Sequence, residues 1–242
     1  MSSSKPSSLP HEIYLSIFSH LSIPDLLSAS QVNQNWHKSS LSILYANLHI
    51  NSKTQLSIFH KYSLLQRHNG LIRSITLCRI NLDVQDKLTL SNECKDLISI
   101  KLIKCSNLTA EFLKDLARSN AKSLEKLYFT ECFSLSAFGI AELFSPSSQH
   151  LPKFHTLILQ YNPEYELDLE FFEFMANNFK SQVFKIIILN SKRFDSKNRK
   201  ILQTFARVSK DLDVLETKKD NIQAIKRERE MTDDEILRMI ED

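Results

Sequence analysis

The sequence has very little glycine and no paired cysteines, and both shortages exclude whole classes of site. Only two glycines, Gly70 and Gly139, occur among 242 residues. A P-loop or a dinucleotide-binding fingerprint needs several glycines at fixed spacing, so neither can be present. The four cysteines include no Cys-x-x-Cys pair, and the eight histidines are dispersed, which leaves no zinc or redox motif. We therefore expect free thiols, no metal and no other cofactor.

Long apolar runs and a strong charge of one sign are also missing. The longest apolar runs, such as residues 184–189, are far too short for a bilayer, and the first eight residues contain no apolar stretch that could serve as a signal peptide. A net charge of +3 is too small to indicate a nucleic-acid partner. No local signature marks a nucleophile with its base. We expect a soluble, non-catalytic protein of the cytoplasm, the nucleus or both, without a membrane partner.

Three short amphipathic helices are predicted at the start of the chain, within residues 9–44. Pro10 suits a first helical turn, and Ser22 to Asp25 fits a capping pattern for the second helix. The apolar stripes at helical spacing are Ile13, Ile17, Phe18 and Leu21, then Leu26, Leu27, Ala29 and Val32, then Leu41 and Leu44. A segment below about 40 residues rarely buries such surface by itself. The stripes must be covered by the rest of the chain or by a partner.

This stretch resembles the F-box motif. The matching residues are Leu9, Pro10, Glu12, Ile13, Ile17, Phe18, Leu21, Asp25, Leu26, Leu27, Val32 and Trp36. In that family the three helices dock on a Skp-family adaptor, which links them to the cullin and RING subunits of an SCF (Skp-cullin-F-box) ubiquitin ligase. At Asn33-Gln34 the chain departs from the family, which commonly has a small or cysteine residue followed by a basic one.

The resemblance assigns roles to particular side chains. It implies that the adaptor face is formed or supported by Leu9, Pro10, Ile13, Ile17, Leu26, Leu27 and Val32. It also implies that Trp36, the only tryptophan, anchors the small core of the box. The alternative is that the stripes simply pack on the remainder of the chain, as the apolar faces of most amphipathic helices do.

The rest of the sequence contains an internal repeat. Residues 97–108 align with residues 124–135, and both fit L-x-x-L-x-L-x-x-C-x-x-L, with Cys105 and Cys132 at the same place. Those cysteines are expected to be small buried core residues. Weaker copies are Tyr45, Leu48 and Ile50; Ile72, Ile75 and Leu77; Phe154, Leu157 and Leu159; Val183, Ile186 and Ile188; and Leu212 with Leu215. A helix is predicted over 109–119, with Phe112, Leu113, Leu116 and Ala117 on one face.

The repeat resembles the cysteine-containing leucine-rich repeat, whose period is about 20 to 29 residues. The fold class we predict is α/β: a short all-α three-helix F-box followed by a leucine-rich-repeat solenoid, with parallel strands alternating with helices. The expected organisation is a disordered N-terminus at 1–8, the F-box at 9–44, the repeats at 45–220 and a charged tail at 221–242.

Side chains alternate across each strand, so the residues between the repeated leucines should point onto the concave face of such an arc. The expected central row is Thr76, Lys101, Tyr128, Ile158, Ile187 and Glu216, and the next row is Cys78, Ile103, Thr130, Gln160, Leu189 and Lys218. The candidate substrate surface consists of the apolar residues of these two rows together with one lysine: Lys101, Ile103, Tyr128, Ile158, Ile187 and Leu189. The alternative is a register error of one residue in the degenerate repeats, which would turn core positions outward.

The tail and the basic clusters leave two further interpretations open. Thr232 and Glu235 form a capping box for a short amphipathic helix, which could cap the last repeat or cover the concave face. Basic clusters at 192–200 and 226–229 could be a nuclear address or a nucleic-acid surface. We do not expect a nucleic-acid partner, because acids neutralise the tail and the first cluster should lie on a convex, solvated helix.

Together these features predict the substrate-recognition subunit of an SCF ubiquitin ligase, in which the F-box docks the adaptor and the arc binds an unknown target protein. A second hypothesis is a scaffold that binds the adaptor without recruiting a substrate for ubiquitination. A third is a hydrolase that uses one of the histidines, for which the sequence shows no clustered acid and base.

Overall fold

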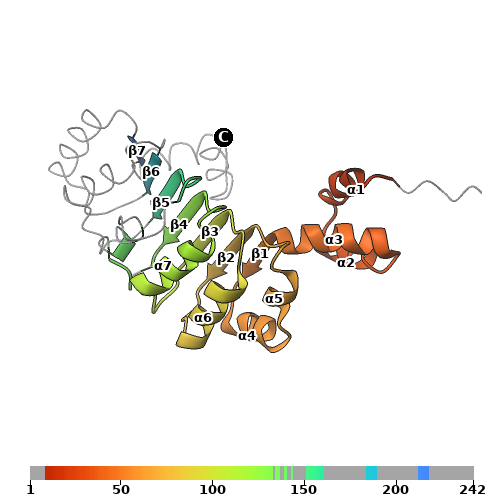
Figure 1. Ribbon diagram of the computed structural model, residues 1–242, viewed down its shortest axis with the longest axis horizontal. Coiled ribbons are helices and arrows are strands. Elements are labelled where there is room, and N and C mark those ends of the chain that lie inside the picture. The colour runs from red at the N-terminus through yellow and green to blue at the C-terminus, as the bar shows by residue number, and fades with distance from the viewer. Residues whose placement is uncertain are drawn as a thin grey trace, which may run out of the picture.

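The computed structural model shows three helices followed by a parallel sheet whose strands lie in chain order (Figure 1). The structure describes residues 9–132, 134–136, 139–140, 143, 151–160, 184–189 and 212–217. The three leading helices are α1 (His11–Phe18), α2 (Ile23–Ala29) and α3 (Gln34–Ala46). The predicted disordered N-terminus and the predicted C-terminal helix lie outside the described residues.

Local capping groups set the starts of these helices. The Ser22 hydroxyl accepts a hydrogen bond from the Asp25 amide at 3.4 Å, which confirms the predicted cap of α2. Asn33 caps α3, because its side-chain oxygen accepts from the Trp36 amide at 3.0 Å. Asparagine is among the best N-cap residues. Asn33, where the chain departs from the F-box motif that it resembles, therefore serves as the N-cap of α3.

The first three helices share a small core of their own. Phe18, Leu26 and Ala29 are buried there. The ring of Trp36 lies edge-on to Phe18 with centroids 5.2 Å apart, and Tyr14 lies 6.3 Å from Trp36. Tilted aromatic pairs at these distances are favourable. Trp36 thus packs against the core of the box, as predicted.

In the described part of the chain the sheet has seven parallel strands, and each strand after the first pairs with the one before it along the chain. The strands are β1 (Asn47–Ile50), β2 (Ser74–Cys78), β3 (Ser99–Ile103), β4 (Lys126–Thr130), β5 (Thr156–Gln160), β6 (Phe184–Leu189) and β7 (Leu212–Thr217). The described helices between strands are α4 (Lys53–Lys61), α5 (Leu64–His68), α6 (Val84–Glu93) and α7 (Ala110–Ser119). Figure 1 shows α4, α6 and α7 along one side of the row of strands. This arrangement confirms the predicted alternation of parallel strands and helices.

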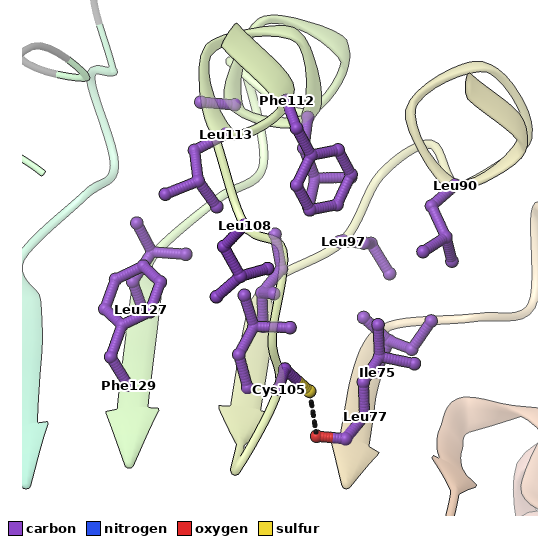
Figure 2. Packing of buried hydrophobic residues seen from close by; sticks show 14 of the residues in the cluster. Ile75, Leu77, Leu90, Leu97, Cys105, Leu108, Phe112, Leu113, Leu127 and Phe129 are labelled. Atoms are coloured by element: carbon purple, nitrogen blue, oxygen red, sulfur yellow. Dashed lines mark hydrogen bonds between the residues drawn. The ribbon is translucent and has the colours of Figure 1, made fainter. Parts of the chain in front are cut away.

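The repeated leucines fall into register and face the helices. Leu48, Ile75, Ile100, Leu127 and Leu157 are successive partners across the sheet and belong to one buried core. In Figure 2, Leu90 of α6 and Phe112 and Leu113 of α7 point toward the strands from the other side of that core. α7 begins after its cap Thr109 and buries the four residues expected on its inner face.

The repeat is reinforced where each strand ends. The Cys105 thiol donates to the Leu77 carbonyl at 3.3 Å (Figure 2), and the Cys132 thiol donates to the Leu102 carbonyl at 3.2 Å. Each cysteine therefore joins one repeat to the strand of the repeat before it. Both are buried core residues, as predicted. Burial raises the pKa of Cys132 and of Cys94 to about 12, so these thiols stay protonated.

Two polar groups connect neighbouring repeats on the helix side. Asn120, 1% exposed, accepts a hydrogen bond from the Leu97 amide at 2.7 Å and donates to the carbonyls of Cys94 and Leu116. Lys53 of α4 pairs with Asp83 and Asp86, the capping box of α6. The hydrogen bond from Lys53 lowers the pKa of Asp83 to about 2.

One predicted register is wrong. We expected Glu216 and Lys218 to complete the two outward rows, but Ile187 pairs with Leu215 and Leu189 pairs with Thr217. The predicted register of β7 is off by one residue. Val214 and Leu215 are both apolar, so the apolar pattern alone does not choose between them. The pairings of Tyr128 with Ile158 and of Ile158 with Ile187 are as predicted.

Candidate protein-binding surfaces

The first candidate surface is the apolar side of the three leading helices, here called the box face: Leu9, Pro10, Ile13, Ile17, Ile23, Leu27 and Val32. In α1, Ile13 and Ile17 are 46% and 48% exposed, whereas Phe18 is buried toward α3. Since Ile13 and Ile17 lie one turn apart, they form one exposed stripe, which none of the described residues covers. Exposed apolar patches of this kind usually mark binding sites.

The second helix contributes in the same way, with one change from the prediction. Leu27 is 52% exposed and Val32 is 58% exposed, but Leu26 is 3% exposed and lies in the core with Phe18. Leu26 can therefore only support the box face from within. Ile23 is 67% exposed. Sequence reasoning did not select Ile23, although its spacing of four residues from Leu27 places both on one side of α2.

A cleft opens next to the box face. It has a volume of about 720 Å³ and is lined by residues of α1 and α3 and by Leu71 from the segment before β2. Leu9 and Pro10 form part of its wall. The Ser39 hydroxyl lies 3.0 Å from Nδ1 of His11 and joins the two helices behind the cleft. The cleft thus connects the box face to the first residues of the repeat region.

The box is joined to the sheet without a linker. α3 ends at Ala46 and β1 begins at Asn47, slightly beyond the boundary at residue 44 expected from the sequence. The Arg73 amide donates to the Ala46 carbonyl at 2.9 Å. The Tyr45 ring stacks on His68 with centroids 4.1 Å apart. These contacts fix the direction of the sheet relative to the three helices.

The second candidate surface is the side of the sheet away from the helices, here called the sheet face. On β3, Lys101 and Ile103 are half-buried, while Ile100 and Leu102 between and beside them are buried in the core. The Lys101 ammonium lies 4.5 Å from the centre of the Tyr128 ring, a cation–π distance. The expected alternation is therefore clear on this strand.

The expected exposed apolar patch is not present on the next two strands. Tyr128 is 4% exposed and Ile158 is 2% exposed, yet neither belongs to the core between sheet and helices. The sheet-face side chains at the centres of β4 and β5 are thus buried. Ile187 and Leu189 stand at the predicted register, but their side chains lie outside the described part of the structure.

Among the described residues, no group of three or more His, Cys, Asp or Glu side chains could hold a metal ion. None of the helices in the described part is long and apolar enough to cross a membrane.

Comparison with known proteins supports the interpretation of the first surface. The F-box-like family model matches residues 6–51, a range that includes α1, α2, α3 and β1. Comparison with curated proteins found no match to the chain. The parallel sheet that follows is consistent with leucine-rich repeats. Residues 6–51 of this chain therefore form an F-box-like domain.

Proposed function

We propose that this chain is a substrate-recognition subunit of an SCF ubiquitin ligase. An F-box-like domain implies binding to a Skp-family adaptor, and through it to the cullin and RING subunits. The observation that carries the proposal is the box face, where large apolar side chains of α1 and α2 remain exposed in a domain that matches this family. Covering such surface with a partner is favourable in proportion to the apolar area removed from water.

The role of the repeats follows from their connection to the box. We interpret them as a leucine-rich-repeat arc that holds the target protein on the accessible part of its sheet face, which includes β3. Because α3 leads directly into β1, a target bound to the sheet is held at a constant position relative to the adaptor. The ligase reaction takes place on the recruited ubiquitin-conjugating enzyme, so this chain contributes proximity and orientation.

Adaptor binding is tested by co-expressing the full chain with a Skp-family protein. The two should co-purify, and Leu9→Ala with Pro10→Ala should weaken the complex. Leu88→Ala is the matched control, because Leu88 of α6 is 50% exposed, as is Leu9, but lies outside the box face. A chain that folds alone and does not co-purify with the adaptor would overturn the proposal.

The ligase role is tested by comparing the half-lives of co-purifying proteins with and without residues 6–51. At least one should be stabilised when the domain is deleted. Unchanged half-lives for all of them would favour an adaptor-bound scaffold instead.

The rigid connection can be tested separately. Inserting a flexible Gly-Ser linker between Ala46 and Asn47 should leave adaptor and target binding intact but slow ubiquitin transfer in a reconstituted ligase. An unchanged transfer rate would show that the direct connection of α3 to β1 has no part in orientation.

A further inference from the structure

The acidic residues are distributed unevenly along the chain. Of the 28 aspartates and glutamates, none occurs between Asp25 and Asp83. This acid-free segment, residues 26–82, contains six lysines and arginines and four histidines. It includes α3, β1, α4, α5 and β2, and so the last helix of the box and the first repeat. Since the whole chain has a net charge of only +3, this part is strongly polarised relative to the rest.

Three cations of the segment lie near the connection between the box and the sheet. Lys61 ends α4, Arg67 lies in α5, and Arg73 comes just before β2. All three side chains are exposed, and none forms an ion pair with a described residue. By contrast, Lys53 at the other end of α4 is paired with two aspartates of the next repeat. We call Lys61, Arg67 and Arg73, together with His37 and His68, the junction patch.

Contacts at the end of α3 hold much of this patch together. His68 of α5 stacks on Tyr45 of α3 with ring centroids 4.1 Å apart. The Arg73 amide donates to the carbonyl of Ala46, the last residue of α3, at 2.9 Å. Figure 1 shows α5 beside β1, close to the end of α3. The patch thus surrounds the point where the box joins the sheet.

The positive groups of the patch lie close enough to repel one another. Burial lowers the pKa of His68, and the nearby charges of Arg67 and His37 lower it further. The Arg73 guanidinium donates to the backbone carbonyl of Asp96 at 3.5 Å, so this contact gives it no carboxylate partner. Uncompensated charges of one sign on a surface attract a partner of the opposite sign.

We propose that the junction patch binds a carboxylate-rich segment of the target protein. This inference rests on the proposed function and names the class of target. Lys61, Arg67 and Arg73 lie outside residues 6–51, so the F-box-like match does not assign them to the adaptor. They belong to the first repeat, in the region that we interpret as the target-binding part. A segment bound here would lie next to the adaptor-bound box.

The arrangement of the charges favours carboxylates over other anions. The three exposed cations come from α4, α5 and the start of β2, so they are spread along the surface. Several single negative charges in a row fit this spacing better than one phosphate, whose two charges need cations that converge on one point. Single-stranded nucleic acids also need aromatic side chains on which bases stack. On α4, Phe59 packs against the core instead, which leaves Tyr62 as the exposed ring next to Lys61.

The test uses the full chain co-purified with its adaptor and a fluorescein-labelled 12-residue peptide in which Glu alternates with Ser. Matched probes are a peptide with Gln for Glu, a phosphoserine peptide in the Gln background, and a labelled oligothymidylate of the same length. Anisotropy should show binding of the Glu peptide and none of the Gln peptide. Arg67→Gln and Arg73→Gln should each weaken it about threefold, and the double variant about tenfold. Raising the salt concentration should weaken it further.

The matched control is Arg79→Gln. Arg79 is also an exposed arginine of the acid-free segment without an ion pair to a described residue, but it lies at the other end of β2 from Arg73. This variant should leave the affinity unchanged, and thermal melting should show that all variants are folded.

Failure of the Glu peptide to bind, equal binding of the Glu and Gln peptides, or an equal effect of the control and the patch variants would overturn the inference. Tighter binding of the phosphoserine peptide or of the oligonucleotide than of the Glu peptide would overturn the choice of carboxylates. Adaptor co-purification is scored in the same samples. Loss of the adaptor with retained peptide binding would reject the proposed function and not this site.

Discussion

Truncating the apolar stripe of α1 should weaken adaptor binding without unfolding the chain. The perturbation is the double variant Ile13→Ala with Ile17→Ala. Both side chains are about half exposed and lie on the side of α1 opposite the buried Phe18. Alanine is the best helix former, so α1 itself should persist.

The magnitude follows from the surface that remains to be buried. Full burial of an isoleucine side chain contributes about 1.5–3 kcal/mol. Since Ile13 and Ile17 are 46% and 48% exposed, the adaptor can bury about half of each. The pair should then contribute roughly 1.5–3 kcal/mol, which corresponds to about a 10- to 150-fold rise in Kd at 1.4 kcal/mol per tenfold.

The assay is calorimetry or surface plasmon resonance with the purified adaptor, together with thermal melting of each variant alone. Ile58→Ala is the matched control, because Ile58 of α4 is 46% exposed, the same fraction as Ile13, and lies outside the box face. A Kd that rises no more than it does for the control, with an unchanged melting temperature, would refute the assignment of this stripe to the adaptor.

Three further predictions concern the stability and chemistry of the repeats. Asn120→Ala should lower the free energy of unfolding by about 2–4 kcal/mol in urea titrations, because it leaves buried backbone groups of the preceding repeat unpaired; a loss below about 0.5 kcal/mol would contradict this role. At pH 8 a thiol reagent should label only Cys78 in the native chain, because the other three cysteines are buried and their pKa values are raised. Labelling of a second cysteine before unfolding would contradict the burial of these three thiols. In the folded chain the pKa of Asp83 is lowered from 3.8 to about 2, so its pairing with Lys53 stabilises the fold above pH 4 and this stabilisation is lost as the pH falls toward 2. The difference in unfolding free energy between the wild type and Asp83→Asn should therefore shrink over that range. A difference that stays constant with pH would contradict this pairing.

Features set by near neighbours in the chain were predictable. The cap of α2 at Ser22 and the start of α7 after Thr109 follow from side-chain oxygens within reach of the next turn. The inward row of strand residues, from Leu48 to Leu157, follows from a period of two within each strand and from the spacing between repeats. The cysteines could be assigned to the core for the same reason, because they recur at one repeat position.

Features that depend on packing between elements were not predictable from the sequence. Leu26 and Leu27 are adjacent members of one apolar stripe, and only the way α2 lies on α3 decides that Leu26 is buried while Leu27 remains on the box face. In β7 two consecutive apolar residues allow two registers, and strand pairing selects Val214 as the partner of Ile186.

The sequence by itself determined the order of elements, the apolar stripes of an F-box-like domain and the inward side of each strand. Those properties depend on contacts within a few residues or on a constant repeat length. Only the tertiary structure decided which outward residues are accessible. Lys101 remains half-exposed on the sheet face, while Tyr128 and Ile158 on the same row are buried. The period of a strand places a side chain on one side of the sheet, but exposure on that side depends on what else packs there.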